Sequence, residues 1–413
     1  MRRLMYATTA LLIIAGLSSC MKDSCEKYRG YTFYQPIYKK ASEVRANIKS
    51  KPPLPIVEPG KLFIQGNYIF LNEKDKGIHI IDNRNPASPV NISFVDIPGN
   101  LDLAVQGNKL YADFYTTLVT LDITNPLDIK AVKFDDGVFP RRNYGYGFVP
   151  DSDLIITSWI RRDTMIKESC SQPVIWYNSY MDYAVSTNSS VKSSSPVGKG
   201  GSMARFALAK NYLYTVSNSD LSVFNLTPEL LPEFSNTVHL NNWSIETIFP
   251  LKDKLFIGSS TGMYVFNIQD PATPVKEGEF FHVQSCDPVI ADDTYAYVTL
   301  RSGNSCGGTT NQLDILKLND ITNPSLVRSY PFKNPRGLSK DGDLLFICDG
   351  DDGLKIFDAS DVTNLKLIKQ IKLTGTYDVI ADNGKALVVA KDGLYQYSYS
   401  DLNKIYLLHA MTY

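Results

Sequence analysis

The sequence predicts an all-β chain built from repeated four-stranded units. The first observation is a phrase that returns roughly every 40 residues: an apolar, β-branched run, then Asp or Asn, then a turn containing proline. It is clearest at 77–90, 118–126 and 263–274. The second observation is that two further apolar segments, joined by a polar turn, precede each copy. The third is the abundance of strand-forming Val, Ile, Phe and tyrosine, of which there are 25.

The first copy shows why the phrase folds as it does. Ile78 to Ile81 is apolar and β-branched, which suits a strand covered on both faces. Asp82 and Asn85 can bond to their own backbone, and Pro86 fixes φ, so the chain must turn there.

The turn residue of each copy sets the count of units. One long interval, from Asp122 to Asn225, fits two units plus an insertion. We therefore predict about eight units, with seven as the alternative, because the third unit is degenerate and could be an elaborated connection. The first two strands of the units are expected at 62–64 and 68–71, 103–105 and 110–112, 148–149 and 154–156, 206–208 and 212–214, 248–249 and 255–257, 289–291 and 295–298, 338 and 344–347, and 379–381 and 386–389.

A four-stranded sheet of this length cannot bury both of its faces alone. Neighbouring units on either side must cover it, and closing the row into a ring removes the exposed ends. The fold class expected for residues 60–413 is therefore a closed β-propeller of four-stranded blades, with an insertion at 161–203.

The N-terminus has the pattern of an export signal. Arg2 and Arg3 precede an apolar stretch, Thr8 to Leu17, that is too short to span a membrane as a mature helix. Leu17-Ser18-Ser19-Cys20 resembles a bacterial lipobox, which implies removal of residues 1–19 and lipidation of Cys20. An ordinary secretory signal is the alternative. Residues 20–59 form a tether whose aromatic part we expect to pack on the propeller, with a short helix within 41–49.

The repeated phrase also carries a family resemblance. Leu118-Val119-Thr120-Leu121-Asp122 and the residues after it resemble the LVIVD repeat, a β-propeller repeat of bacterial surface and secreted proteins. The lipobox and the phrase at 97–102 resemble the Bacteroidetes lipoproteins that carry it. This resemblance implies an outer-membrane lipoprotein of the cell envelope, and the charged pair Lys22-Asp23 is similar to a surface-export tag. The resemblance implies no chemistry.

Export places the remaining cysteines in an oxidising setting, where disulfides persist. Five cysteines follow Cys20, so at least one has no partner within the chain. We expect a Cys286–Cys306 disulfide, because both would lie on one face of the same blade. Cys306 pairing with Cys348 or Cys170 is the alternative, and Cys25 has no assigned partner.

Candidate ligand-binding residues gather on the face where each first strand begins. An ionisable residue repeatedly precedes or opens that strand and could ring the mouth of the channel. The insertion that carries Trp176 and Tyr177 falls on the same face, and Arg141-Arg142 could clamp a carboxylate or sulfate there. Mutual pairing and packing on the rim are the structural alternatives. The ring residues are Asp102, Arg205, Glu246, Asp287, Arg336 and Asp378.

Other motifs limit the function. Asp349 to Gly353 resembles part of a calcium loop, but its spacing and final Glu are missing, so a hairpin turn is the first interpretation. No histidine pair has metal-ligand spacing, and no nucleophile elbow, P-loop or dinucleotide fingerprint occurs. The net charge of −1 argues against a nucleic-acid partner. We therefore expect no cofactor and no metal site. Calcium at the turn from Asp349 to Gly353 is the alternative.

These observations favour a binding or scaffolding module over an enzyme. The expected role is a lipid-anchored propeller of the cell envelope that binds a protein or a glycan. The alternative is a hydrolase or lyase that uses Arg, Asp and Glu side chains in the central funnel. Purely structural assembly in the envelope is a third hypothesis.

Overall fold

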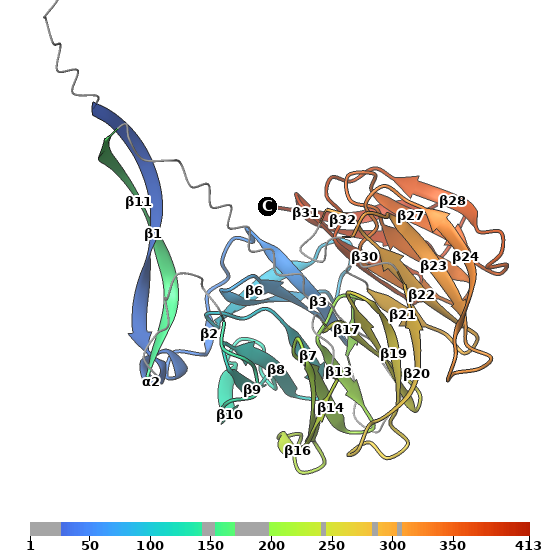
Figure 1. Cartoon of the computed structure of the whole chain (residues 1–413), viewed down its shortest axis with the longest axis horizontal. Helices are drawn as coiled ribbons and strands as arrows, with labels where there is room; N and C mark the ends of the chain where they lie inside the picture. The colour runs from blue at the N-terminus through green and yellow to red at the C-terminus, as the bar shows by residue number, and fades with distance from the viewer. Residues whose placement is uncertain (1–25, 143–152, 170–197, 241–244, 283–287, 304–307) are drawn as a thin grey trace, which may run out of the picture. The chain divides into compact units, whose positions relative to one another are not determined.

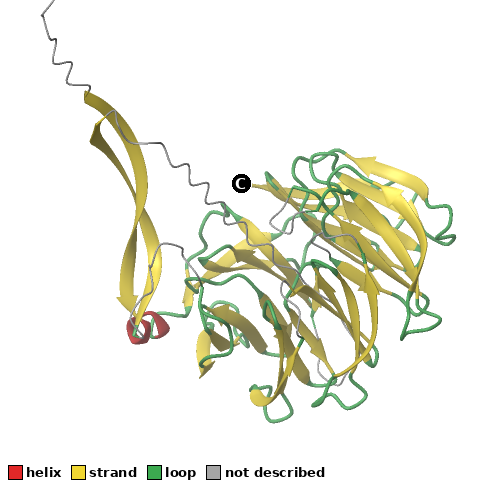
Figure 2. Cartoon of the chain, in the orientation of Figure 1, coloured by secondary structure: helices red, strands yellow, loops and turns green. Residues whose placement is uncertain are grey.

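The computed structural model of the chain describes residues 26–142, 153–169, 198–240, 245–282, 288–303 and 308–413. Its contacts divide the chain into two units, one of residues 1–38 and 156–180 and one of residues 39–155 and 181–413. Strands make up most of both units (Figure 2). Among the described residues, no helix has both the length and the apolar character that a membrane span requires.

The larger unit contains seven blades of four antiparallel strands within the described residues (Figure 1). Chain order and spatial order agree in each blade. Blade 1 is β3 (Pro59–Gln65), β4 (Tyr68–Glu73), β5 (Gly77–Asp82) and β6 (Val90–Asp96); blade 2 is β7 (Leu103–Gln106), β8 (Lys109–Phe114), β9 (Thr117–Asp122) and β10 (Lys130–Asp135); blade 3 is β13 (Phe206–Ala209), β14 (Tyr212–Val216), β15 (Asp220–Asn225) and β16 (Glu233–His239).

The remaining four blades repeat this order. Blade 4 is β17 (Ile245–Leu251), β18 (Lys254–Ser259), β19 (Gly262–Asn267) and β20 (Val275–Phe281); blade 5 is β21 (Val289–Ala291), β22 (Tyr295–Leu300), β23 (Gln312–Lys317) and β24 (Ser325–Pro331); blade 6 is β25 (Leu338–Asp341), β26 (Leu344–Cys348), β27 (Leu354–Asp358) and β28 (Lys366–Ile371); blade 7 is β29 (Asp378–Asp382), β30 (Lys385–Ala390), β31 (Gly393–Ser398) and β32 (Tyr406–Thr412).

The ring is closed through its innermost strands. β3, β7, β13, β17, β21, β25 and β29 each contact the next, and β29 contacts β3 again. The first strand of every blade is therefore innermost, as expected. Side chains of blades 1 and 7 share one buried cluster, in which Leu62 and Ile69 meet Ile380 and Val389. Apolar packing, without exchange of a strand between the ends, closes the circle.

The repeated phrase forms the turn that the sequence predicts. The Asp82 carboxylate accepts the Arg84 backbone N–H at 3.0 Å, and Asp122 accepts that of Thr124 at 2.9 Å. A second turn of the same kind follows, with Ala87 N–H on Asn85 at 3.2 Å. In each blade the register then shifts between the third and fourth strands, which is a β-bulge.

The count of seven confirms the alternative and corrects the expectation of eight. The predicted third unit does not form a blade. Its expected first strand at 148–149 lies outside the described residues, and Leu154 to Ile156 open the long strand β11 (Leu154–Ser169). β11 pairs with β1 (Glu26–Lys40) in a two-stranded sheet. The sequence of this stretch lacks the Asx phrase that ends the third strand of a blade.

The tether contributes more structure than expected. Its strand β1 belongs to the smaller unit as far as Tyr38, and the expected packing of its aromatic residues on the propeller stays a prediction. Helix α2 (Ala41–Arg45) lies within the range expected for a helix. β2 (Ser50–Lys51) adds to the outer edge of blade 1 by pairing with β6.

Candidate functional site

The ring of ionisable residues lies around the channel, where the innermost strands begin. Asp102 and Arg205 directly precede β7 and β13, and Asp378 is the first residue of β29. Asp378 and Asp102 are buried, and so is Glu246 in β17, whereas Arg205 and Arg336 are partly exposed. We call the end of the ring where these strands begin the front face. The turns between second and third strands lie on it too.

A segment of the chain itself runs inside the ring. Residues 198–204, called the channel segment below, lie at the end of the long insertion and include β12 (Lys199–Gly200), which pairs with β3. Gly198 N–H donates to Val105 of β7 at 2.9 Å, and Ile248 N–H of β17 donates to Ala204 at 3.2 Å. The Ser202 hydroxyl accepts Leu338 N–H of β25 at 2.6 Å. A segment bonded to the inner strands of this many blades must run inside the ring.

Lys61 is the charged residue at the centre of this arrangement. It lies within the buried part of β3, and its ammonium donates to the Met203 carbonyl of the channel segment. Burial lowers the pKa of Lys61 to about 7, although Asp102 and Asp378 nearby favour its charged form. Burial likewise raises the pKa of Asp102 to about 7 and that of Asp378 to about 7. These groups balance one another's charge away from water.

Backbone amides hold both central carboxylates in place. Asp378 Oδ1 accepts Ser202 N–H at 3.1 Å and Val379 N–H at 3.0 Å, while its Oδ2 has no hydrogen-bond partner among the described residues. Asp102 accepts the Arg205 N–H at 2.5 Å and Leu103 N–H at 2.7 Å. Of the predicted ring residues, Asp102, Arg205 and Asp378 are therefore held next to the channel segment or the strands that contact it.

A cavity of about 190 Å³ opens beside the channel, between blades 2 and 3. We call it the arginine pocket. Three arginines and two aspartates are among its lining residues, so its lining carries a net positive charge. Those five residues are Arg141, Arg142, Arg205, Asp102 and Asp113. Four of them were expected as ligand-binding residues, and the structure brings these four together at one pocket.

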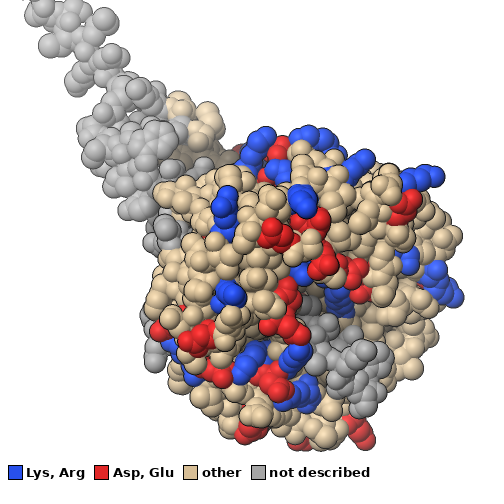
Figure 3. All heavy atoms as spheres, turned by 90° about the vertical axis from the view of Figure 1, so that its right-hand side faces the viewer, with Lys and Arg blue, Asp and Glu red and all other residues tan. Residues whose placement is uncertain are grey.

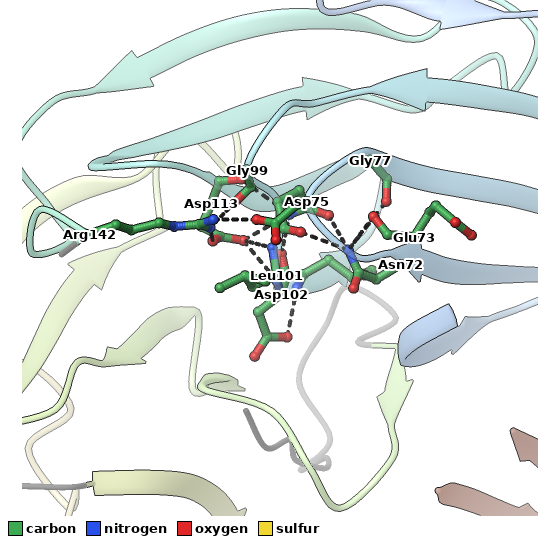
Figure 4. A network of polar contacts seen from close by, with 11 residues as sticks. Asn72, Glu73, Asp75, Gly77, Gly99, Leu101, Asp102, Asp113 and Arg142 are labelled. Carbon is green, nitrogen blue, oxygen red and sulfur yellow. Dashed lines mark hydrogen bonds and ion pairs between the residues drawn. The ribbon is translucent and has the colours of Figure 1, made fainter. Parts of the chain in front are cut away.

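Arg142 and Asp113 belong to a polar network that fixes the wall of the pocket (Figure 4). The Arg142 guanidinium bonds the Asp75 carboxylate and the Gly99 carbonyl, and lies 3.8 Å from Asp113 Oδ2. Asp113 accepts the backbone N–H groups of Leu101 at 2.8 Å and Asp102 at 2.7 Å. Burial raises the pKa of Asp113. This arginine is therefore committed to the framework.

The other two arginines keep capacity for a ligand. Arg205 Nη2 donates to Asn218 Oδ1 at 2.7 Å and to the Ile245 carbonyl at 3.2 Å, but its buried Nε has no hydrogen-bond partner among the described residues. Arg141 is exposed, and its guanidinium makes no hydrogen bond or ion pair within the described part of the chain. Two guanidinium groups at one cavity are suited to a carboxylate or a sulfate.

Figure 3 shows the charged side chains on one face of the molecule. Basic and acidic side chains are interspersed across that face. In the lining of the arginine pocket, by contrast, three arginines outnumber two aspartates.

Several predicted residues lie outside the described part of the chain. These are Asp287, Trp176, Tyr177, the lipidation site Cys20, and both partners of the expected disulfide, Cys286 and Cys306. Their roles stay predictions. Cys348, named as an alternative partner of Cys306, is a buried free thiol in the structure.

The turn that resembles a calcium loop carries lysine partners. Asp352 lies 3.0 Å from the Lys333 ammonium, 2.8 Å from that of Lys355 and 2.9 Å from that of Lys372. Asp349 also bonds Lys355, at 2.6 Å. These lysines hold the pKa of Asp352 below its usual range. Among the described residues, no group of three or more candidate ligands could hold a metal ion.

Sequence reasoning missed Lys61, Asp113 and the channel segment. Lys61 stands just before the apolar residues of β3, the position at which the other units supplied the predicted ring, so the repeat itself could have identified it. Asp113 gave no comparable signal in the sequence. The channel segment gave none either, because it follows a serine-rich run and has no strand pattern of its own.

Comparison with known protein families matches the LVIVD repeat at residues 60–96 and 336–372. The first match covers the strands of blade 1 and the second those of blade 6. Blades 1 and 6 are LVIVD repeats. The resemblance first seen at residues 118–126 therefore identified the right repeat, although the matched segments are other blades. No curated protein matches the chain.

Solved structures similar to this propeller share its fold at low identity. The periplasmic gluconolactonase of Pseudomonas aeruginosa is 10% identical, with a TM-score of 0.53 over 86% of this chain and 96% of that chain. The computationally designed Ika8 protein is 10% identical, with a TM-score of 0.52 over 87% and 88%. A protein from Lactobacillus plantarum is 11% identical, with a TM-score of 0.50 over 78% and 86%. Likeness at this identity concerns the fold alone.

Proposed function

We propose that this LVIVD propeller is a binding module of the cell envelope that holds an anionic group of a protein or glycan in the arginine pocket. The observation that carries the proposal is the pair of arginines, Arg141 and Arg205, with unused hydrogen-bonding capacity at one cavity. Their neighbours Asp102 and Asp113 are bonded to backbone amides, so they shape the wall. A guanidinium pair recognises carboxylates by charge and by geometry.

Lipidation of Cys20 would place the propeller at the outer membrane. The support is the lipobox-like sequence before Cys20, because lipid chains gain about 0.8 kcal/mol per buried CH₂ group and two or three chains give stable anchoring. Replacing Cys20 by Ala should move the chain from the membrane fraction to the soluble fraction and abolish labelling with a fatty-acid probe. Membrane attachment that survives this substitution would contradict the lipid anchor.

A binding screen tests the proposed ligand class. Residues 21–413 would be screened against glycan arrays and envelope extracts, alongside an Arg141→Gln variant. We expect captured ligands to be anionic and the variant to lose at least about tenfold in affinity, as for a lost charge-assisted contact of about 1.4 kcal/mol. Arg84→Gln is the matched control, since Arg84 pairs with Asp82 in the exposed turn between β5 and β6, away from the front face. If Arg141→Gln and Arg84→Gln lost the same affinity, the proposal that the ligand binds in the arginine pocket would be contradicted.

One observation favours a second candidate, a hydrolase or lyase. Asp102 and Lys61 both have a pKa near 7, which suits groups that exchange protons. The channel segment lies against Lys61, which is why we favour binding. Incubating the chain with acidic polysaccharide and assaying new reducing ends or unsaturated uronates distinguishes the two: product that disappears in Asp102→Asn favours the enzyme.

A further inference from the structure

The arginine pocket has a larger neighbour. A second cavity of about 780 Å³ lies between helix α2, the β8–β9 turn and the stretch after β10. We call it the outer groove. Tyr115, Phe139 and Arg141 line both cavities, so the two are adjacent. The arginine pocket alone is smaller than the roughly 300–1,000 Å³ of typical small-molecule sites, whereas the outer groove falls within that range.

The lining of the outer groove differs from that of the pocket. It offers hydroxyls and carboxylates, among them Thr116, Thr117 and Asp136. Asp136 accepts the Thr117 hydroxyl at 2.7 Å and pairs with Arg45, yet its side chain is still 63% exposed. Acceptors of this kind suit ligand hydroxyl groups. Lys40 and Arg45 also line the groove, so it offers cations for further carboxylates of the same ligand.

Tyr115 stands at the boundary between the cavities in a strained backbone conformation. Its φ is 53°, in the left-handed region that bulky residues rarely adopt. Arg142 lies 5.2 Å from the centroid of its ring, and Phe114 meets the ring edge-on at 5.6 Å. Gly99 makes room for the ring, because a Cβ there would lie 2.8 Å from it. A strained aromatic held on several sides is typical of ligand sites.

We infer that the ligand is an acidic oligosaccharide, with one carboxylate between Arg141 and Arg205 and the adjoining sugars in the outer groove against Tyr115. This inference rests on the proposed function and narrows its ligand. An acidic peptide fits less well, because its acidic side chains offer no hydroxyl groups to the acceptors of the outer groove. A sugar chain with one carboxylate per residue can instead turn its hydroxyls to these acceptors.

Titration calorimetry with residues 21–413 tests the inference. The probes are galacturonate, trigalacturonate, maltotriose as the neutral trisaccharide, and tetraglutamate as the acidic peptide. We expect trigalacturonate to bind at least about tenfold more tightly than each of the others, since contacts in the groove add to those in the pocket. Tetraglutamate binding as tightly as trigalacturonate would overturn the inference.

Two substitutions at Tyr115 separate the groove from the pocket. Tyr115→Gly removes the ring and relaxes the positive φ, so folding should survive; Tyr115→Phe keeps the ring. We expect Tyr115→Gly to reduce trigalacturonate affinity to that of galacturonate, and Tyr115→Phe to bind both as the unsubstituted chain does. Thermal unfolding confirms that each variant is folded.

The same titrations distinguish failure of the inference from failure of the proposed function. If galacturonate binds and Arg141→Gln weakens it, but trigalacturonate binds no more tightly, the proposed function stands and the inference is wrong. If no anionic probe shows a dependence on Arg141, both are wrong.

Discussion

Three buried side chains decide how the centre of this propeller responds to pH. Lys61, Asp102 and Asp378 lie within one another's electrostatic reach, and burial opposes the charged form of each. A buried charge that lost its partner would cost several kcal/mol, so these residues depend on one another. The sequence predicted two of them, because the repeat places an ionisable residue at the start of each inner strand. Their burial could not be predicted, since it results from a segment distant in the chain.

Asp378→Asn should remove part of the pH dependence of folding. An unfolded Asp has a pKa of about 3.9, and burial raises that of Asp378 to about 7. Between these values the folded chain binds more protons, so its stability falls as pH rises. The Asn side chain keeps an acceptor for Ser202 and Val379 without the charge. Urea unfolding should therefore show that the free energy of unfolding falls less from about pH 5 to about pH 7 in the variant than in the unsubstituted chain.

The control for this prediction is Asp320→Asn. Asp320 lies in an exposed turn, where bonds from Thr322 hold its pKa below the usual range. Its contribution to stability is lost only as pH falls below about 4, so the interval from pH 5 to 7 should be unaffected. If Asp378→Asn lost as much unfolding free energy from about pH 5 to about pH 7 as the unsubstituted chain does, the Asp378 carboxyl would be ionised in the folded chain and the prediction would be wrong.

A glycine beside Asp378 is required by space. A Cβ on Gly201 would overlap the Asp378 carboxylate, which is buried and cannot move aside. We expect Gly201→Ala to destabilise the chain by about 1–3 kcal/mol, as overpacking does. Gly30→Ala is the control, because its nearest neighbour, Met165 Sδ, would lie at an ordinary 3.7 Å. If Gly201→Ala and Gly30→Ala unfolded at the same urea concentration, the close packing of the channel segment against Asp378 would be contradicted.

At the scale of elements, the blades could be predicted and the channel segment could not. Each blade reads as alternating apolar runs and Asx turns, so local sequence was enough to place its strands. The channel segment takes its structure from partners such as Val105, Leu338 and Ile248, far away in sequence. The third predicted unit failed for a related reason: an apolar run at 154–156 signals a strand, but not which sheet it joins.

Ser202→Ala tests the role of the channel segment. The Ser202 hydroxyl is the acceptor for the buried Leu338 N–H at 2.6 Å. Removing it leaves that donor unsatisfied, which should cost about 1–3 kcal/mol of unfolding free energy. Ser360→Ala removes a hydroxyl in an exposed turn and should cost much less. If both variants unfold at the same urea concentration, the channel segment does not brace the inner strands.

At the scale of the whole molecule, closure by packing makes the blades interdependent. Blade 7 covers the apolar side of blade 1, and no exchanged strand ties the ends together. Deleting residues 374–413 should expose Leu62, Ile69 and Leu71 and abolish cooperative thermal unfolding. Deleting residues 21–38, which lie in the other unit, should leave the melting transition of the propeller nearly unchanged. A cooperative, monomeric six-blade fragment would contradict this account of closure.

Hydrogen exchange in the presence of trigalacturonate is the most direct test of the claim that the ligand binds beside the channel segment. Residues 21–413 would be labelled with and without the ligand and digested for mass spectrometry. We predict added protection in peptides that contain Tyr115 and Arg141, and none in those from β25 and β29, on the opposite side of the channel segment. Protection spread over the inner strands of all the blades would mean that the channel opens and receives the ligand, and would contradict the account.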